Sequence, residues 1–357
     1  MCDSTHSCCS PSLVSVLISM LLVSACRLGS LTSTPIPPTA TLVSPSTGAP
    51  LATSIDTATP TQPAQSPRPE WSDSLLASLP PGSYIGILQP LDPSDLYGPN
   101  VLSLLSRDGV TLGVLATAPI DQALLSPQAD HIAYTRMGTG GLCIRTISSG
   151  HTVCSLGEDF VRYPTWSRDG SFILAMVGDR VAAIDPTTAE LLASATCHLM
   201  LGLDEADCFN PTLSADGKWI AVAYAEANNA PAQPSPTGIY VFTLDCLGPS
   251  PCSQPPRKIP KFYSDDFSWA PQFMHLAIGA SSIFDVAAWA LVRELPLSSY
   301  IRRSVLWSPD GGYLAFTNDL SVFVADSATG DVTEIYFAPA GLSLEFWVDV
   351  NSTDPSP

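Results

Sequence analysis

A short motif recurs along this chain and limits the folds that it can adopt. Each copy has an apolar run, a turn built on Ser-x-Asp-Gly and a second apolar run. The clear copies are PTWSRDGSFILAMV (164–177), PTLSADGKWIAVAY (211–224) and VLWSPDGGYLAFTN (305–318), and LLSPQADHIAYTR (124–136) and FSWAPQFMHLAIGA (267–280) are degenerate ones. Successive differences between the equivalent positions 126, 167, 214, 270 and 308 are 41, 47, 56 and 38 residues. This period is typical of the blades of a β-propeller.

The residues of the turn have a mechanical explanation. Pro309 presets φ for a turn, Asp310 can bond the following backbone, and Gly311 can adopt a positive φ. We therefore predict tight hairpins in which these side chains are structural and not catalytic. The residues assigned this role are Ser167, Asp169, Gly170, Ser214, Asp216, Gly217, Ser308, Asp310 and Gly311. The tryptophans before the turn, Trp166, Trp269 and Trp307, are predicted to pack between neighbouring blades.

Two further strand-like runs follow each motif, as in residues 321–326 and 331–337. Four strands therefore make a blade. The first blade has only three (84–89, 101–106 and 110–116), and one strand, 342–350, is left over at the C-terminus. Joining these removes an exposed edge. The sequence thus predicts an all-β fold over residues 71–357: a six-bladed β-propeller of four-stranded antiparallel blades, with the ring closed by the C-terminal strand.

The repeats resemble the WD40-like (PD40) repeats of the TolB-like propeller family, over roughly residues 80 to 350. The resemblance implies the fold and says little about function. TolB-like proteins also carry an N-terminal α/β domain. Here only residues 71–81 lie between the Ser/Thr/Pro-rich segment that ends at residue 70 and the first predicted strand, which is too short for such a domain. The partner contacts of the Tol system are therefore not transferred to this chain.

The N-terminal segment carries an apolar run at residues 13–25, which is too short for a comfortable membrane span and fits the core of an export signal. It ends in Val-Ser-Ala-Cys, which resembles a bacterial lipobox and implies a signal peptide over residues 1–25 and lipidation at Cys26. Residues 26–70 are rich in Ser, Thr and Pro and are predicted to form a disordered stalk. We expect a lipoprotein on the outer face of the cell membrane, with a simple N-terminal anchor or a cytoplasmic chain as alternatives.

Six cysteines of the predicted propeller form three close pairs, Cys143/Cys154, Cys197/Cys208 and Cys246/Cys252. Local pairing favours disulfides and agrees with export. A hairpin turn at Ser148 and Ser149 would place the first two cysteines opposite each other on neighbouring strands. Free buried thiols and thiolate metal ligands remain alternatives.

The charge and the motifs restrict the chemistry. With 33 acidic and 15 basic residues and a net charge of −18, the chain would repel a phosphate backbone, so we predict no nucleic-acid partner and membrane contact through the lipid only. G-x-S-x-G and H-E-x-x-H motifs are absent, and we predict no catalytic residue, metal or cofactor. Calcium at the acidic run 204–207 remains an alternative, as does a metal held by distant histidines in the central channel; the histidines are His6, His131, His151, His198 and His275.

Long connections suggest where a ligand would bind. Residues 90–100, 197–208 and 226–238 would leave one face of a propeller, and long loops on a rigid scaffold often carry binding surfaces. The residues predicted to contact a ligand are Tyr97, Leu201, Asp204 and Asn228, although neutral insertions would look the same.

The leading hypothesis is a monomeric, non-catalytic binding or protein-interaction scaffold for an envelope or extracellular protein, with a glycan as another possible ligand. The alternative is a lyase-like or lactonase-like propeller enzyme acting on extracellular polysaccharide or a small ester, which would need several His, Asp or Glu side chains together in the channel. A purely structural role in the envelope ranks third.

Overall fold

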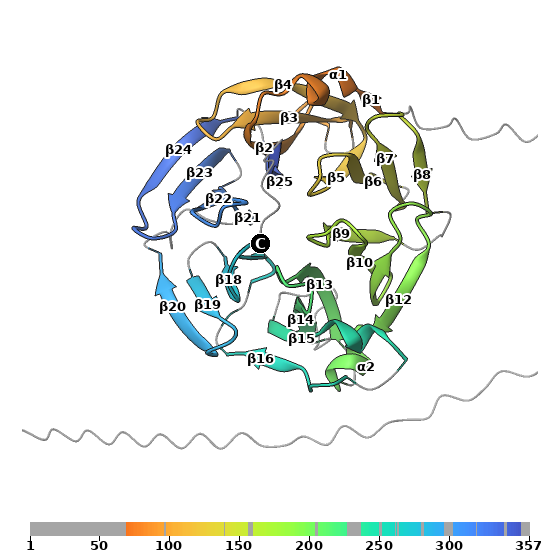
Figure 1. Cartoon of the computed structure of the whole chain (residues 1–357), viewed down its shortest axis with the longest axis vertical. Helices are drawn as coiled ribbons and strands as arrows, with labels where there is room; N and C mark the ends of the chain where they lie inside the picture. The colour runs from red at the N-terminus through yellow and green to blue at the C-terminus, as the bar shows by residue number, and fades with distance from the viewer. Residues whose placement is uncertain are drawn as a thin grey trace, which may run out of the picture. The chain divides into compact units, whose positions relative to one another are not determined.

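The computed structural model describes residues 69–350 except 96–97, 139, 156–159, 204–205, 227–236, 250–251, 261, 263, 280–281, 296–302, 319 and 339–340. The predicted signal peptide, Cys26 and nearly all of the predicted stalk lie outside the described residues. The strands form six antiparallel sheets that radiate from a common axis as the blades of a propeller (Figure 1). The sequence-based prediction of a six-bladed β-propeller is confirmed.

Blades 2 to 6 each contain four strands in chain order, and the first strand of each blade lies nearest the axis (Figure 1). Blade 2 comprises β5 (Ile120–Leu125), β6 (His131–Arg136), β7 (Leu142–Thr146) and β8 (Thr152–Cys154); blade 3 comprises β9 (Val161–Trp166), β10 (Ile173–Val177), β11 (Arg180–Ile184) and β12 (Leu191–Thr196); blade 4 comprises β13 (Ala206–Leu213), β14 (Trp219–Glu226), β15 (Gly238–Thr243) and β16 (Arg257–Ile259); blade 5 comprises β17 (Phe267–Trp269), β18 (His275–Ile278), β19 (Ser282–Asp285) and β20 (Ala290–Glu294); blade 6 comprises β21 (Arg303–Trp307), β22 (Tyr313–Thr317), β23 (Ser321–Asp326) and β24 (Val332–Phe337).

Blade 1 joins the two ends of the folded chain. Its inner strand is β25 (Ser343–Val350), followed outward by β2 (Gly82–Pro90), β3 (Asn100–Ser106) and β4 (Thr111–Ala118). Pairing between β25 and β2 runs from Gly82↔Val350 to Leu88↔Ser343. The predicted closure by the C-terminal strand is confirmed. Because β2 and β25 pair with each other, neither strand has an unpaired edge at this junction.

Blade 1 also has a fifth strand that the sequence analysis missed. Strand β1 (Glu70–Trp71) pairs with the outer edge of β4, and helix α1 (Asp73–Ser78) follows it. Glu70, assigned to the end of the stalk, therefore belongs to the sheet. We call residues 70–79 the N-terminal strap, because it connects blade 1 to blade 2: the Trp71 and Tyr134 rings lie 5.2 Å apart, and Asp73 pairs with Arg145 at 2.5 Å.

The strap should contribute measurably to stability. Trp71→Ala removes a half-buried indole that packs against blade 2, and we expect it to lower the free energy of unfolding by about 2 kcal/mol. Urea unfolding measures this. Leu199→Ala is the control, since that side chain is 73% exposed and should change stability by less than about 0.5 kcal/mol. Equal effects of the two substitutions would show that the strap contributes no packing energy.

The core consists of six hydrophobic clusters, each of which lies between two neighbouring blades. The predicted role of the tryptophans is visible in their hydrogen bonds. Trp166 Nε1 donates to the carbonyl oxygen of Leu124 at 3.3 Å, Trp269 Nε1 to that of Thr212 at 3.2 Å, and Trp307 Nε1 to that of Ser268 at 3.0 Å. Each bond ends on the inner strand of the preceding blade. The indoles therefore fill the space between neighbouring blades and also hold the blades at a fixed distance.

The Ser-x-Asp-Gly segments form the hairpins between the first and second strands. In blade 6, the buried hydroxyl of Ser308 accepts the backbone N–H of Tyr313 at 2.9 Å and donates to Asp310 at 2.5 Å, while Gly311 has φ +71°. The Ser214 and Ser167 hydroxyls accept the N–H of Trp219 and Phe172 in the same way. In the degenerate copy of blade 2, Ala129 takes the glycine position with φ +56°.

Removal of one such hydroxyl tests this arrangement. Ser308→Ala leaves the Tyr313 N–H without its hydroxyl acceptor, and we expect a loss of about 1–2 kcal/mol in the free energy of unfolding. Ser74→Ala, at an exposed position of α1, is the matched control for the loss of a serine hydroxyl. A Ser308→Ala protein as stable as the Ser74→Ala protein would contradict a structural role for the motif serine.

All three predicted cysteine pairs are disulfides. Cys143 and Cys154 lie opposite each other on β7 and β8, with Cα atoms 4.0 Å apart, as the predicted hairpin requires. The Cys197–Cys208 bond joins helix α2 (Cys197–Leu201) to β13, and Cys246–Cys252 closes a loop after the 3-10 helix η1 (Leu244–Leu247). Three disulfides fit a protein of an oxidising compartment. Across the part of the chain that the structure describes, no helix is long and apolar enough to cross a membrane.

Candidate functional site

The inner strands of the six blades surround a cavity of about 740 Å³ at the axis of the ring. We call this cavity the channel mouth. Its lining comes from every blade: Asp121, Gln122, Leu124, Arg162, Tyr163, Pro164, Thr165, Asn210, Thr212, Leu213, Asp265, Asp266, Phe267, Ser268, Trp269, Ser304, Val305, Leu306, Ser343, Leu344 and Glu345. A pocket of this size accommodates a small molecule or one large side chain of a partner.

β-Bulges shape the channel mouth. Pairing between the first and second strands is irregular in five of the six blades, at Asp121, at Tyr163 and Pro164, at Asn210 and Pro211, at Ser304 and at Glu345. Tyr163, Asn210 and Ser304 have φ values of +53°, +47° and +55°. Such backbone is costly for residues other than glycine and often occurs at functional sites. A bulge also turns a side chain that regular alternation would have directed elsewhere.

Side chains at the mouth bond to the backbone of the next blade. Glu345 Oε2 accepts the N–H of Ala123 at 2.8 Å, and Gln122 Oε1 accepts the N–H of Tyr163 at 2.7 Å. Asn210 Nδ2 donates to the carbonyl oxygen of Asp265 at 2.7 Å. The inner strands have no further strand to pair with on the axial side, so these bonds satisfy part of their free edge and hold the mouth in one shape.

The wall of the mouth carries four carboxyl groups and one guanidinium, that of Arg162. Burial, with a smaller contribution from the charge of Asp121, raises the pKa of Glu345 to about 7, against the hydrogen bonds from Ser343 and Ala123. Burial also raises the pKa of Asp121, although Arg162 opposes the shift, and burial raises the pKa of the Tyr163 phenol. Perturbed groups that share one cavity are a physical indication of a functional site.

Only one of the ligand-contacting residues predicted from the long connections lies in the described part of the chain. Tyr97, Asp204 and Asn228 lie outside it. Leu201, at the end of α2, is 8% exposed and belongs to the core between blades 3 and 4, so its side chain contributes packing and offers almost no surface to a ligand. The connections themselves join the strand ends that surround the channel mouth, because they lead into first strands or follow second strands.

None of the histidines that the structure describes is among the residues that line the cavity. His131 and His275 begin β6 and β18, at the opposite end of the blades, and their rings pair with Asp130 at 2.8 Å and Asp285 at 3.8 Å. Over the residues that the structure describes, no three His, Cys, Asp or Glu side chains converge as metal ligands would. The acidic run 204–207, suggested for calcium, is described only in part.

A search of the solved structures returns a similar ring. TolB from Acinetobacter baumannii matches with a TM-score of 0.50 and 15% sequence identity, and the match covers 75% of this chain and 66% of that one. The fold is that of a TolB-like β-propeller. This chain therefore spans slightly less than two thirds of the length of TolB. A structure of the nidogen/laminin complex matches with a TM-score of 0.47 and 13% identity, covering 74% of this chain and 99% of that one.

Other comparisons add no function to the TolB-like propeller. No protein-family model matches the chain, and no curated protein matches it. At 15% identity, the likeness to TolB extends to the fold alone, so the chemistry of this propeller has to be argued from its own side chains.

The sequence analysis placed the site of the alternative enzyme in the channel but named none of the lining residues as part of that site. The lining residues are dispersed from position 121 to position 345 and become neighbours only when the ring closes. One local signal was present: Pro164 and Pro211 stand where a regular strand would need a backbone N–H, and proline in a strand marks an edge or a bulge. The buried glutamate in the apolar segment SLEFWV was a second signal, because such a carboxyl requires a structural or functional reason.

Proposed function

We propose that this TolB-like propeller is an exported, lipid-anchored binding module that contacts an envelope or extracellular partner at the channel mouth. The observation that carries the proposal is the cavity of about 740 Å³ whose wall includes bulged and positive-φ residues from several blades. The three long connections join strand ends on one side of the blades. A rigid scaffold with a polar central pocket and loops around its rim is a common design for recognition.

The remaining parts of the proposal follow from the sequence. Cys26 would carry the lipid, and the segment that precedes Glu70 would hold the propeller away from the membrane as a stalk. The three disulfides support exposure to an oxidising compartment. We expect the Cys26→Ser protein to be lost from the membrane fraction of its native cells and to lose incorporation of a labelled fatty acid. A Cys26→Ser protein that stays in the membrane and keeps the label would reject the lipid anchor.

Binding at the mouth can be tested by charge reversal. We would capture the full-length protein from its native cells after chemical cross-linking and compare wild type with Asp121→Arg by mass spectrometry. The Asp121 side chain still reaches solvent at the mouth, although the surrounding walls raise its pKa, so the change should spare the fold. Asp108→Arg is the matched control, because Asp108 lies in the exposed turn between β3 and β4, at the other end of the blades.

A stoichiometric partner that is lost with Asp121→Arg and kept with Asp108→Arg is the expected result. A partner captured equally by both variants would place its contact surface elsewhere on the protein. Clean recovery with no co-purifying protein would favour a glycan or another small ligand over a protein partner.

One observation favours an enzyme as a second candidate function. The channel holds four carboxyl groups, as the enzyme hypothesis required, and the pKa of Glu345 is raised to about 7, a value suited to general acid–base catalysis at neutral pH. Assays of polysaccharides and small esters with wild type and Glu345→Gln test this. Turnover by wild type that falls at least 100-fold in the variant would establish the enzyme. If neither the polysaccharides nor the esters are turned over, the binding module remains the proposed function.

A further inference from the structure

The walls of the channel mouth have a surplus of negative charge and of hydrogen-bond acceptors. Asp121 comes from blade 2, Asp265 and Asp266 precede the inner strand of blade 5, and Glu345 comes from blade 1. Arg162, on blade 3, is the one basic residue among the described lining. The whole chain carries a charge of −18, so its field also favours the approach of cations.

The placement of the carboxyl groups disfavours a single metal ion as the ligand. They come from three different blades, and no three acidic, histidine or cysteine side chains of the described residues converge as metal ligands would. Calcium needs six to eight oxygens at 2.3–2.6 Å. A ligand with several N–H donors spread over a larger volume can instead satisfy acceptors on different walls.

Buried acceptors with spare capacity supply an independent indication. Glu345 is 8% exposed, and its two oxygens accept one hydrogen bond each, from Ala123 N and from the Ser343 hydroxyl at 2.5 Å. A carboxylate has about four acceptor positions. Thr212 is another residue of the lining, and its buried Oγ1 has no hydrogen-bond partner among the described residues. Unsatisfied buried groups are costly and call for a partner.

An aromatic ring adds to the wall. The half-buried Tyr163 lines the same cavity, and the face of a tyrosine ring attracts ammonium and guanidinium groups. An organic cation has donors and no acceptors, and it therefore matches both the charge and the hydrogen-bonding surplus of this cavity.

We propose that the channel mouth binds an organic cation, namely an ammonium or guanidinium group that a ligand inserts between the walls of blades 1, 2 and 5. This inference rests on the proposed function and names the chemistry that its site selects. A basic side chain of a partner protein and a free polyamine share this chemistry.

The test uses hexane-1,6-diamine as the cationic probe, hexane-1,6-diol as a neutral probe of the same length, and calcium chloride as the metal alone. Each is titrated into the full-length protein at low ionic strength by calorimetry. The mouth variant is Asp121→Asn combined with Asp265→Asn, two exposed carboxylates of the lining. Asp108→Asn combined with Asp331→Asn, two exposed carboxylates at the other end of the blades, is the charge-matched control.

We expect the diamine to bind wild type and the control alike, to bind the mouth variant at least tenfold more weakly, and to lose affinity as salt is added; the diol should show no binding. Diamine binding that is equal in the mouth variant and the control would overturn the inference, and so would saturable binding of the diol or calcium without the diamine. If the diamine fails while capture of a partner still depends on Asp121, the cation is rejected and the binding module stands.

Discussion

Truncation of Phe346 to alanine should lower the free energy of unfolding by about 4 kcal/mol. Phe346 lies on the closing strand β25, is buried, and belongs to the core between blades 1 and 2. Its loss leaves a cavity at the seam where the two ends of the folded chain meet, and the bulge beside it limits how far the seam can collapse. Urea unfolding monitored by tryptophan fluorescence measures the effect.

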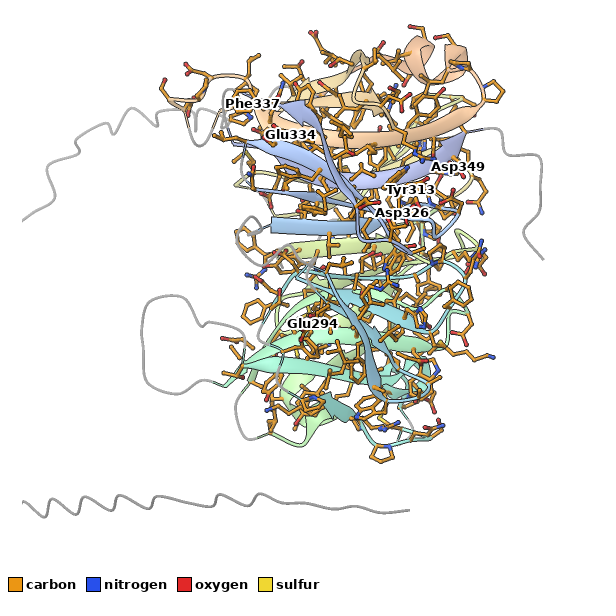
Figure 2. All side chains as sticks on the ribbon, turned by 90° about the vertical axis from the view of Figure 1, so that its left-hand side faces the viewer. Glu294, Tyr313, Asp326, Glu334, Phe337 and Asp349 are labelled. Atoms are coloured by element: carbon orange, nitrogen blue, oxygen red, sulfur yellow. A yellow bond between two sulfur atoms is a disulfide. The ribbon has the colours of Figure 1, made fainter. Side chains whose placement is uncertain are left out.

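Phe337→Ala is the matched control for Phe346→Ala. Phe337 ends the outer strand of blade 6 and is 62% exposed at the rim (Figure 2), so we expect its truncation to change stability by less than about 0.5 kcal/mol. Comparable losses from both substitutions would contradict the view that the seam is a principal source of stability.

A double substitution makes the test of the seam sharper. A Cβ on Gly86 would lie 2.4 Å from two ring atoms of Phe346, so Gly86→Ala alone should cost about 2–3 kcal/mol by forcing the buried ring to shift. In the Phe346→Ala background the space is free, and the same change should cost less than about 1 kcal/mol. Additive losses would show that the two residues are not in contact.

Glu345 should make the stability of the ring depend on pH. Its pKa is raised from 4.5 to about 7 in the folded protein. Between these two values the folded state keeps a proton that the unfolded state has released, so the free energy of unfolding falls as pH rises. The fall is about 1.4 kcal/mol per pH unit and about 3 kcal/mol in total, and it ends once pH exceeds the folded pKa.

Glu345→Gln should remove this dependence, because the amide oxygen can still accept the N–H of Ala123 and the side chain no longer ionises. The stability of the variant relative to wild type should therefore increase by about 3 kcal/mol between pH 4.5 and pH 8. Glu294→Gln, on the exposed rim strand β20 (Figure 2), is the control and should follow wild type. A difference between Glu345→Gln and wild type that stays constant with pH would contradict a buried, titrating carboxyl.

The parts of the fold that depend on local chemistry could be predicted from the sequence. Ser214 and Gly217 define a hairpin without reference to the rest of the chain, and the cysteine spacing of β7 and β8 defines their register. Strand β23 (Ser321–Asp326) has the predicted bounds. Closure by β25 followed from counting strands, because a ring has no place for an unpaired one.

The remaining features depend on contacts between distant segments. The strap consists of a two-residue strand and a six-residue helix, too short for any periodicity to predict, and its pairing requires β4 and Tyr134 to be in place. Bulges arise from the pairing of two strands, so the exposure of Asp121 and Tyr163 to one cavity could not be seen in either strand alone.

The central claim, that ligands enter the channel mouth, is most directly tested by a photo-cross-linking amino acid placed at position 121 of the full-length protein in its native cells. The same residue at position 108, at the other end of the blades, gives the background. We expect a discrete adduct from position 121 that free hexane-1,6-diamine suppresses, and no such adduct from position 108. Identical adduct patterns from the two positions would contradict the claim.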